Sequence, residues 1–334
     1  MTRHIRGDPI LADHFVRPDT RAFLDMLAAM PEMPWPPQPA AYRAQYLAMK
    51  DLVDLPQGEL ATVKDLTIPG PAGPIPARLF DVRESREPGP VVLFFHGGGF
   101  VIGNIDSHAS FTAEMSRMLD LPVVSIDYRL APESPWPAAS DDCEAAARWV
   151  ASNPAELGRA VTAIALAGDS AGGQIAAVAA IDLRDAPAAV PVIGQLLIYP
   201  AADFDGDYAS ADHFAEGYLL TAKGMEWFNE CYGPDFDHPR ASPMRHATLE
   251  GLPPALVLTA SLDPIRDQGR AYAGALAAAG VPVIFREAVG TIHGFITLRR
   301  AIPSAQGDVA GMLVAFRALL TEAEANRVMA QAAA

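Results

Sequence analysis

Cysteine and lysine are scarce in this sequence. Its 334 residues include two cysteines, Cys143 and Cys231, and three lysines, Lys50, Lys64 and Lys223. Two cysteines are too few for a disulfide framework, and they lack the paired spacing of a zinc site. Because basic residues are few, the formal net charge is −15, which disfavours contact with a polyanion such as nucleic acid. We therefore expect no nucleic-acid partner, and no motif indicates a metal site or a cofactor.

Long hydrophobic runs are also missing. None reaches the roughly 18 residues that a membrane span requires. The opening stretch, "MTRHIRGDPILADHF", lacks the apolar segment of a signal peptide. These absences favour a cytoplasmic protein with no stable membrane association. The length allows one large domain, or one domain with an attached cap.

Strand-like runs are separated by turns or by helix-like runs through most of the chain. They cover residues 59–68, 74–82, 90–95, 122–128, 161–167, 192–199, 254–260 and 281–288. From the third run onward they are short and apolar and alternate with helical patterns, which predicts a mostly parallel sheet with helices on both faces. The first two runs, joined by the turn "PGPAG", predict an antiparallel hairpin at one edge. The expected fold class is therefore α/β, with a mostly parallel eight-stranded sheet.

Two segments depart from this alternation. Residues 1–50 contain helix-like pieces joined by the proline-rich "PEMPWPPQP", and residues 203–245 are rich in aromatics without a strand pattern. An insertion of this length is more typical of a lid over a site than of a structureless loop. We expect N-terminal cap helices over residues 1–50, and a main α/β domain over residues 51–334 that carries a cap insertion at about 203–245.

A serine lies in a short turn between a predicted strand and a predicted helix. Ser170 is the centre of "GDSAG", which follows the apolar run "VTAIALA" and precedes "GQIAAVAAIDL". A G-x-S-x-G pattern in this context is typical of a nucleophile elbow, a strained turn that exposes the serine hydroxyl above the sheet. Its glycines would let the strand and the helix approach closely. Taken alone, the pattern also fits an ordinary turn with a capping serine.

Other motifs could complete a hydrolytic site. The glycines of "HGGGF", residues 96–100, leave backbone N–H groups free to stabilise an oxyanion. His293, in "GTIHGF" after the last strand, is the candidate base. For the acid, "TASLDPIRDQG" offers Asp263 or Asp267. Asp263 lies in the loop before a proline suited to a first helical turn, a place where it could also cap the helix, whereas Asp267 would lie inside the helix. The chain order Ser, Asp, His is that of α/β-hydrolases.

The motif set resembles a known family. "HGGGF", "DYRLAPE", "GDSAGG", "DPIRDQG" and "HGF" together are similar to the bacterial hormone-sensitive-lipase-like (family IV) esterases of the α/β-hydrolase superfamily, over about residues 60 to 300. The resemblance implies an α/β-hydrolase fold with a helical cap. It also implies a catalytic triad and an oxyanion hole, made of Ser170 as nucleophile, His293 as base, Asp263 as its orienting acid, and the N–H groups of Gly98, Gly99 and Ala171.

Three other features near these motifs are interpreted as structural. We read "DYRLAPE" as structural, His96 as a buried support of its loop, and Asp169 as a support of the site. The pocket wall is assigned to Tyr199, Phe214 and Leu219. Bulky cap side chains would make this pocket apolar and closed at one end.

The resulting hypothesis is a serine carboxylesterase for short- to medium-chain acyl esters, which works through an acyl-enzyme and without a cofactor. The expected partner is a small-molecule ester, and the sequence leaves a homodimer open. An amidase or peptidase of the same fold is the nearest alternative. A non-catalytic ligand-binding relative is less favoured because Ser170 and His293 are both present.

Overall fold

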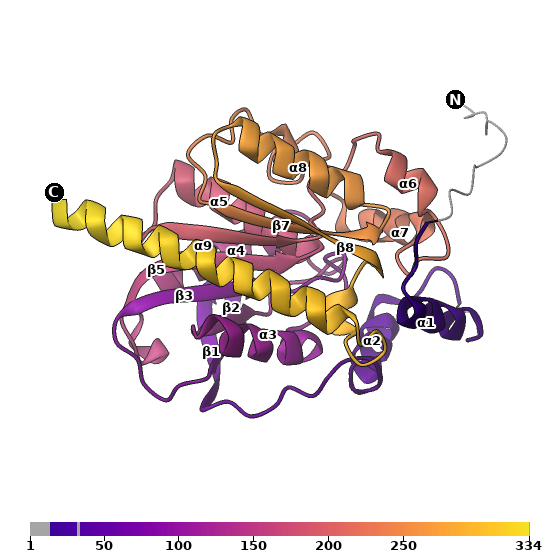
Figure 1. Cartoon of the computed structure of the whole chain (residues 1–334), viewed down its shortest axis with the longest axis horizontal. Coiled ribbons are helices and arrows are strands. Elements are labelled where there is room, and N and C mark those ends of the chain that lie inside the picture. Colours follow the sequence, from indigo (N-terminus) through magenta and orange to yellow (C-terminus); the bar gives the residue numbers. More distant parts are fainter. Residues whose placement is uncertain (1–13, 32–33, 334) are drawn as a thin grey trace.

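A mixed sheet organises the part of the chain that the computed structural model describes, residues 14–31 and 34–333 (Figure 1). Its eight strands run in the order β1-β2-β4-β3-β5-β6-β7-β8. Strands β3 to β8 are parallel, and β2 is antiparallel to both of its neighbours, β1 and β4. The expected mostly parallel sheet with an antiparallel edge hairpin is confirmed. The bounds are β1 Thr62–Gly70, β2 Gly73–Asp81, β3 Gly89–Phe95, β4 Val123–Ile126, β5 Val161–Asp169, β6 Val192–Ile198, β7 Ala255–Leu262 and β8 Val283–Ile292.

The central strands form from apolar runs that are covered on both faces. In β5 every residue except Thr162 is buried, as a parallel sheet between two helical layers requires. The largest difference from the expected strand ends is at β8. Its pairing with β7 resumes after an irregularity between Ala260 and Leu262 and continues to Ile292. This extension carries the chain to His293 at the edge where the other parallel strands end.

Two helical layers enclose the sheet. The core on one face includes Phe111 of α3 and Phe316 of α9, and the core on the other face includes Ile175 of α5 and Tyr272 of α8. Figure 1 shows α9 running along the sheet beside α3. The amphipathic helices therefore bury their apolar sides on the strands. The bounds are α3 Ile105–Leu119, α4 Ala138–Ala151, α5 Ala171–Asp185, α8 Arg266–Ala278 and α9 Ala305–Ala333.

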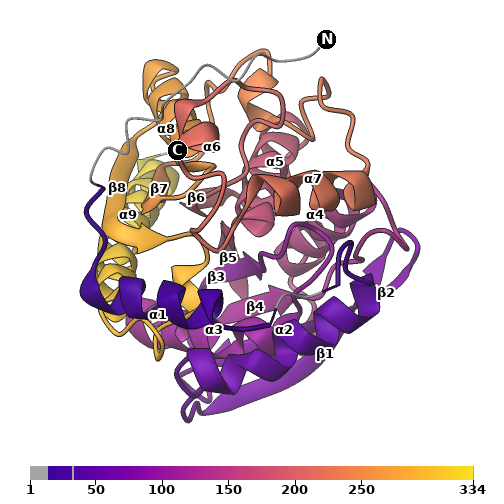
Figure 2. The same cartoon turned by 90° about the vertical axis from the view of Figure 1, so that its right-hand side faces the viewer.

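Further helices lie over the carboxyl ends of the parallel strands. In Figure 2, α1 and α2 lie on one side of these strand ends, and α6 and α7 lie on the other. Proline begins both α1 and α2, where its missing N–H removes no helical hydrogen bond. Arg43 fastens α2 to the body by donating to the carbonyls of Val101 and Ala131, each at 2.7 Å, and to the carboxylate of Glu133. The bounds are α1 Pro18–Ala28, α2 Pro39–Val53, α6 Ala209–His213 and α7 Ala222–Tyr232. Elsewhere in the chain, short 3-10 helices cover Ala155–Leu157, Pro243–Arg245 and Phe295–Thr297.

Two parts of the expected N-terminal cap, residues 1–13 and 32–33, lie outside the described residues. Within residues 14–31 and 34–333, no helix combines the length and the apolar character needed to cross a bilayer.

Candidate active site

Ser170 lies at a strained turn between β5 and α5. Its backbone has φ 55° and ψ −117°, a conformation that non-glycine residues rarely adopt. The flanking glycines are required by close packing. A Cβ on Gly168 would lie 2.1 Å from the carbonyl oxygen of Gly172, and a Cβ on Gly172 would lie 1.9 Å from that of Phe95. The turn therefore has the geometry expected of a nucleophile elbow, since glycine at these two positions lets the strand and the helix approach so closely.

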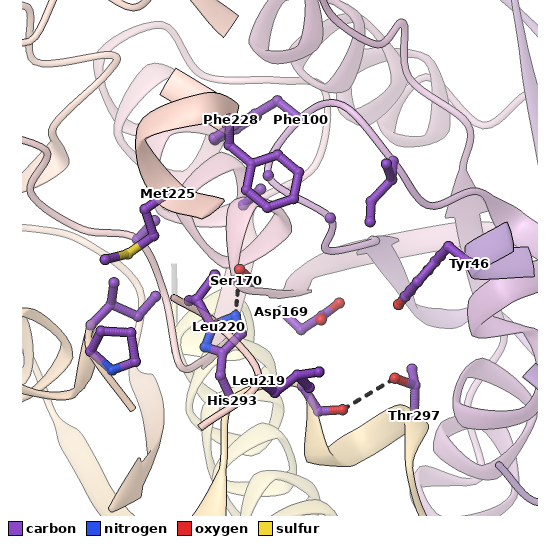
Figure 3. Close-up of a pocket in the computed structure, with 18 of the residues that line it drawn as sticks. Tyr46, Phe100, Asp169, Ser170, Leu219, Leu220, Met225, Phe228, His293 and Thr297 are labelled. Atoms are coloured by element: carbon purple, nitrogen blue, oxygen red, sulfur yellow. Dashed lines mark hydrogen bonds between the residues drawn. The ribbon is translucent and has the colours of Figure 1, made fainter. Parts of the chain in front are cut away.

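His293 connects this serine to a buried acid. Its Nε2 lies 2.8 Å from Oγ of Ser170, and its Nδ1 lies 2.7 Å from Oδ2 of Asp263. Figure 3 shows the His293 ring directly against the Ser170 hydroxyl. The ring also packs on Tyr199, with the two ring centroids 4.5 Å apart. The three residues come from the ends of β5, β7 and β8, so the sheet itself holds them in hydrogen-bonding order.

The structure brings Asp263, and not Asp267, to the histidine. Asp263 is fully buried, and its second oxygen accepts the backbone N–H of Ile265 at 2.9 Å, so this carboxylate also caps the first turn after β7. Asp267 instead forms ion pairs with Arg266 and Arg270 and accepts a backbone N–H from the α6 side. Of the two candidate acids in the sequence, Asp263 is therefore the one that contacts His293.

The glycine loop after β3 presents free backbone donors. Gly98 and Gly99 have φ of 122° and 59°, and a Cβ on Gly98 would lie 2.2 Å from the carbonyl oxygen of Ile102. Within the described part of the chain, the backbone N–H groups of Gly98, Gly99 and Ala171 make no hydrogen bond. Ala171 also begins α5, where the helix dipole favours negative charge. Such donors can stabilise an oxyanion that forms at Ser170.

Asp169 ties this loop to the nucleophile turn. Its carboxylate accepts the N–H of Gly97 at 2.7 Å, lies 3.4 Å from Nε2 of His108 and accepts the Tyr199 hydroxyl at 3.4 Å. Burial by itself raises the pKa of Asp169, but the charge and hydrogen bond of His108 and the N–H of Gly97 outweigh it, so the pKa lies below its usual value. The carboxylate is therefore ionised, and Figure 3 shows it between Ser170 and Tyr46.

Sequence reasoning did not find His108. It lies in the first turns of α3 and is 1% exposed. A histidine inside an amphipathic helical run carries no local signal of its partner, because that partner, Asp169, is distant in the chain. The pairing becomes visible only when α3 packs beneath the nucleophile turn.

His96 supports the same loop from within, as its position suggested. Its ring is fully buried and stacks on Tyr128 with centroids 4.3 Å apart, while its Nδ1 contacts the carbonyl oxygen of Gly97 at 2.8 Å. Burial, followed by the charge of His108, lowers the pKa of His96 to about 3. His96 is therefore neutral near pH 7. The "DYRLAPE" segment also acts as a support, since the Tyr128 hydroxyl donates to the carbonyl of His96 at 2.6 Å.

A cavity of about 460 Å³ lies over Ser170 and His293. Its wall joins both sides of the cap to the glycine loop (Figure 3). Most of the lining side chains are apolar or aromatic, which suits the hydrocarbon parts of a substrate. They include Phe23, Met30, Tyr46, Leu220, Met225 and Phe228.

The expected pocket wall needs one correction. Leu219 lines the cavity, but Tyr199 and Phe214 do not. Tyr199 lies beneath the His293 ring and is 1% exposed. Phe214 is fully buried, and its ring packs against Tyr218 and under the guanidinium of Arg266. Both aromatics are packing residues because the tight cap insertion and the sheet bury them on all sides.

Comparison with known proteins agrees with this architecture. Residues 92–297 match the family model described as alpha/beta hydrolase fold. The chain is 41% identical over 278 residues to esterase LipI of Mycobacterium tuberculosis, covering 81% of this chain and 87% of that protein. It is 37% identical over 221 residues to an ethyl acetate hydrolase of Pseudomonas putida, covering 65% and 69%. The solved ester hydrolase EH1AB1 from the Lake Arreo metagenome has a TM-score of 0.85 at 38% identity, covering 91% of this chain and 98% of that one.

The chain therefore belongs to the alpha/beta hydrolase fold family. Within that family it is one of the bacterial hormone-sensitive-lipase-like esterases, and it is a carboxylic ester hydrolase. The expected fold, family and ester-hydrolase activity are confirmed. The amidase or peptidase alternative finds no support among these relatives.

Proposed function

We propose that Ser170 is the nucleophile of this esterase, with His293 as general base and Asp263 as the acid that orients it. One observation carries the assignment: the unbroken chain of contacts of 2.8 Å from Ser170 to His293 and 2.7 Å from His293 to Asp263. A base held by a buried carboxylate and aimed at a strained serine is the geometry that nucleophilic acyl transfer requires.

In the proposed reaction, Ser170 Oγ attacks the ester carbonyl while its proton passes to Nε2 of His293. The N–H groups of Gly98, Gly99 and Ala171 stabilise the oxyanion of the tetrahedral intermediate. The intermediate collapses when the imidazolium returns the proton to the departing alkoxide, which leaves an acyl-enzyme. Water, deprotonated by the same histidine, then attacks the acyl carbon, releases the carboxylic acid and restores the serine.

We further propose that the substrates carry short- to medium-chain acyl groups. The apolar, bounded cavity of about 460 Å³ supports this preference, as does the Pseudomonas putida relative, which is named for ethyl acetate. Each acyl methylene that is buried adds up to about 0.8 kcal/mol, until the chain meets the wall, where overpacking costs about 1–3 kcal/mol.

The test is a series of 4-nitrophenyl esters of rising acyl length, assayed for kcat/KM. We expect a rise from acetyl to butanoyl or hexanoyl and a steep fall beyond. Efficient hydrolysis of long-chain triglyceride emulsions would contradict the chain-length proposal. In parallel, an aryl phosphonate should label Ser170, as located by peptide mass spectrometry, and labelling at another residue would contradict the nucleophile assignment.

The organisation of the chain and its setting are proposed as well. We infer that residues 1–50 and about 203–245 form a cap on a catalytic domain that spans residues 51–334.

The two free cysteines, Cys143 and Cys231, suit a reducing cytoplasmic compartment, and cell fractionation would test that location. A homodimer is supported by the edge position of β8, whose Phe285 and Val289 are exposed; light scattering in solution tests it.

A further inference from the structure

Three polar side chains line the side of the cavity formed by residues 203–208 of the cap insertion and the start of α8. They are Asp203, Tyr208 and Gln268. They belong to the same cavity as Pro264 and Ile265, which directly follow the proposed acid Asp263 in the chain. A substituent of an ester bound at Ser170 could therefore reach this polar group.

Asp203 and Tyr208 are hydrogen-bonded to each other. The Tyr208 hydroxyl donates to Oδ2 of Asp203 at 3.0 Å. The other carboxylate oxygen, Oδ1, accepts the Asp205 N–H at 3.3 Å and Nε of Arg245 at 3.4 Å. The Asp203 carboxylate is thus hydrogen-bonded to Tyr208 and paired with Arg245, which it shares with Asp205 and Asp237, and its side chain is 10% exposed.

Gln268 is different because only the oxygen of its side-chain amide has a hydrogen-bond partner among the described residues. The backbone N–H of Asp203 donates to Oε1 of Gln268 at 3.0 Å. A backbone N–H can only donate, so this contact fixes which end of the amide is the oxygen. The Nε2 end then carries two N–H donors, for which the described residues provide no acceptor. It is not among the fully buried atoms that lack a partner, so it remains accessible.

We propose that Gln268 Nε2 is a specificity donor for esters that carry a second oxygen, as an ether, a hydroxyl or a carbonyl, on a short chain next to the scissile ester. This inference rests on the proposed site at Ser170. A neutral oxygen fits better than a carboxylate, because the Asp203 carboxylate lies beside the amide and repels an anion. An alkyl chain at the same place leaves the amide without an acceptor in a mainly apolar cavity, which is unfavourable.

The test uses substrates in which one methylene is replaced by oxygen. On the acyl side, 4-nitrophenyl methoxyacetate and 3-methoxypropanoate are compared with the butanoate and pentanoate. On the alcohol side, 2-methoxyethyl butanoate is compared with butyl butanoate. The measured quantity is the ratio of kcat/KM for the oxygen ester to that for the carbon ester. Comparing this ratio between variants cancels the different intrinsic reactivities of the two esters.

Two variants remove the donor in different ways. Gln268→Glu keeps an acceptor for the Asp203 N–H and removes both donors, and Gln268→Met is similar in shape and removes all hydrogen bonding. Gln45→Met makes the same chemical change on α2, on the opposite side of the cavity, and serves as the matched control.

In both Gln268 variants we expect the ratio to fall roughly threefold to tenfold, which corresponds to the loss of one neutral hydrogen bond. The fall is expected for either the acyl-side or the alcohol-side pairs, and the ratio should stay constant in Gln45→Met. A ratio that is unchanged on both sides overturns the proposal, as does an equal loss for both members of every pair, which would mean that Gln268 only holds the loop at Asp203. Failure of the wild type to hydrolyse 4-nitrophenyl butanoate would instead count against the proposed esterase site.

Discussion

Two serine–histidine–aspartate arrays meet at the end of β5. In one, Ser170 contacts His293, which contacts Asp263. In the other, Ser107 Oγ lies 2.9 Å from Nδ1 of His108, whose Nε2 lies 3.4 Å from Asp169. The same three residue types are thus in contact twice, and both serines line the cavity.

The difference lies in what surrounds each serine. The Ser107 hydroxyl is engaged in a capping box, since it accepts the N–H of Asn104 and donates to the carbonyl of Asn104, each at 2.9 Å. Ser170 contacts His293 alone, from a strained backbone, beside N–H groups that have no acceptor within the described chain. Hydrogen bonds among serine, histidine and aspartate therefore do not by themselves distinguish the two arrays. The distinguishing feature is a serine hydroxyl that, among the described residues, bonds only the histidine and lies next to backbone N–H groups that could stabilise an oxyanion.

The largest effect should come from breaking the first array at its serine. Ser170→Ala should lower kcat for 4-nitrophenyl butanoate by about a million-fold, because a triad acts as a unit. Its thermal unfolding should match that of the wild type. Retention of more than a few per cent of the activity would reject Ser170 as the nucleophile.

Ser107→Ala is the matched control in the second array. Loss of the capping box should cost about 1 kcal/mol in the free energy of unfolding, with kcat reduced less than about tenfold. If this variant lost as much activity as Ser170→Ala, the distinction between the two arrays would be wrong.

The second largest effect should come from the acid that orients His293. Asp263→Asn should lower kcat about 10⁴-fold, because the amide no longer selects the histidine tautomer that can accept the serine proton. Asp267→Asn should cost far less, since Asp267 pairs with Arg266 and Arg270. Steady-state kinetics on both variants checks this, and the reverse ranking would show that the acid is misassigned.

A smaller effect should follow from weakening the second array at its acid. Asp169→Asn removes the charge that faces His108 and loosens the bond to the Gly97 N–H. We expect kcat to fall about 10- to 100-fold, less than for loss of an oxyanion donor itself, with little change in KM. A rise in KM at constant kcat would place Asp169 in substrate binding and not in the support of the glycine loop.

The smallest effect concerns acid stability. The pKa of Asp169 is lowered in the folded protein, so its ionised form stabilises the fold above the unfolded value near 3.8, and this contribution is lost as pH falls through the folded pKa. The free energy of unfolding of the wild type should exceed that of Asp169→Asn by about 1–3 kcal/mol. This difference should be constant near neutral pH and should fall toward zero below about pH 4. Urea titrations across pH measure it, and a difference that widens in acid would contradict the ionised state.

The sequence by itself determined the strands, their parallel arrangement, and the serine, the histidine and two candidate acids of the first array. These features are local. Apolar runs between turn residues specify strands, and the glycines around Ser170 and in "HGGGF" mark backbone conformations that other residues cannot adopt. Because parallel strands end at one edge, residues that follow β5, β7 and β8 had to converge there.

Only the tertiary structure decided which side chains face the cavity and which are buried beneath it. Tyr199, Phe214 and Phe228 are all aromatic, and nothing in the sequence distinguishes their environments. In the structure the first two pack into the core and the third lines the cavity. The His108–Asp169 pair and the free amide of Gln268 likewise depend on contacts between distant segments. Packing fixes these orientations because each requires two elements to meet at a particular rotation, and no local pattern of residues encodes that rotation.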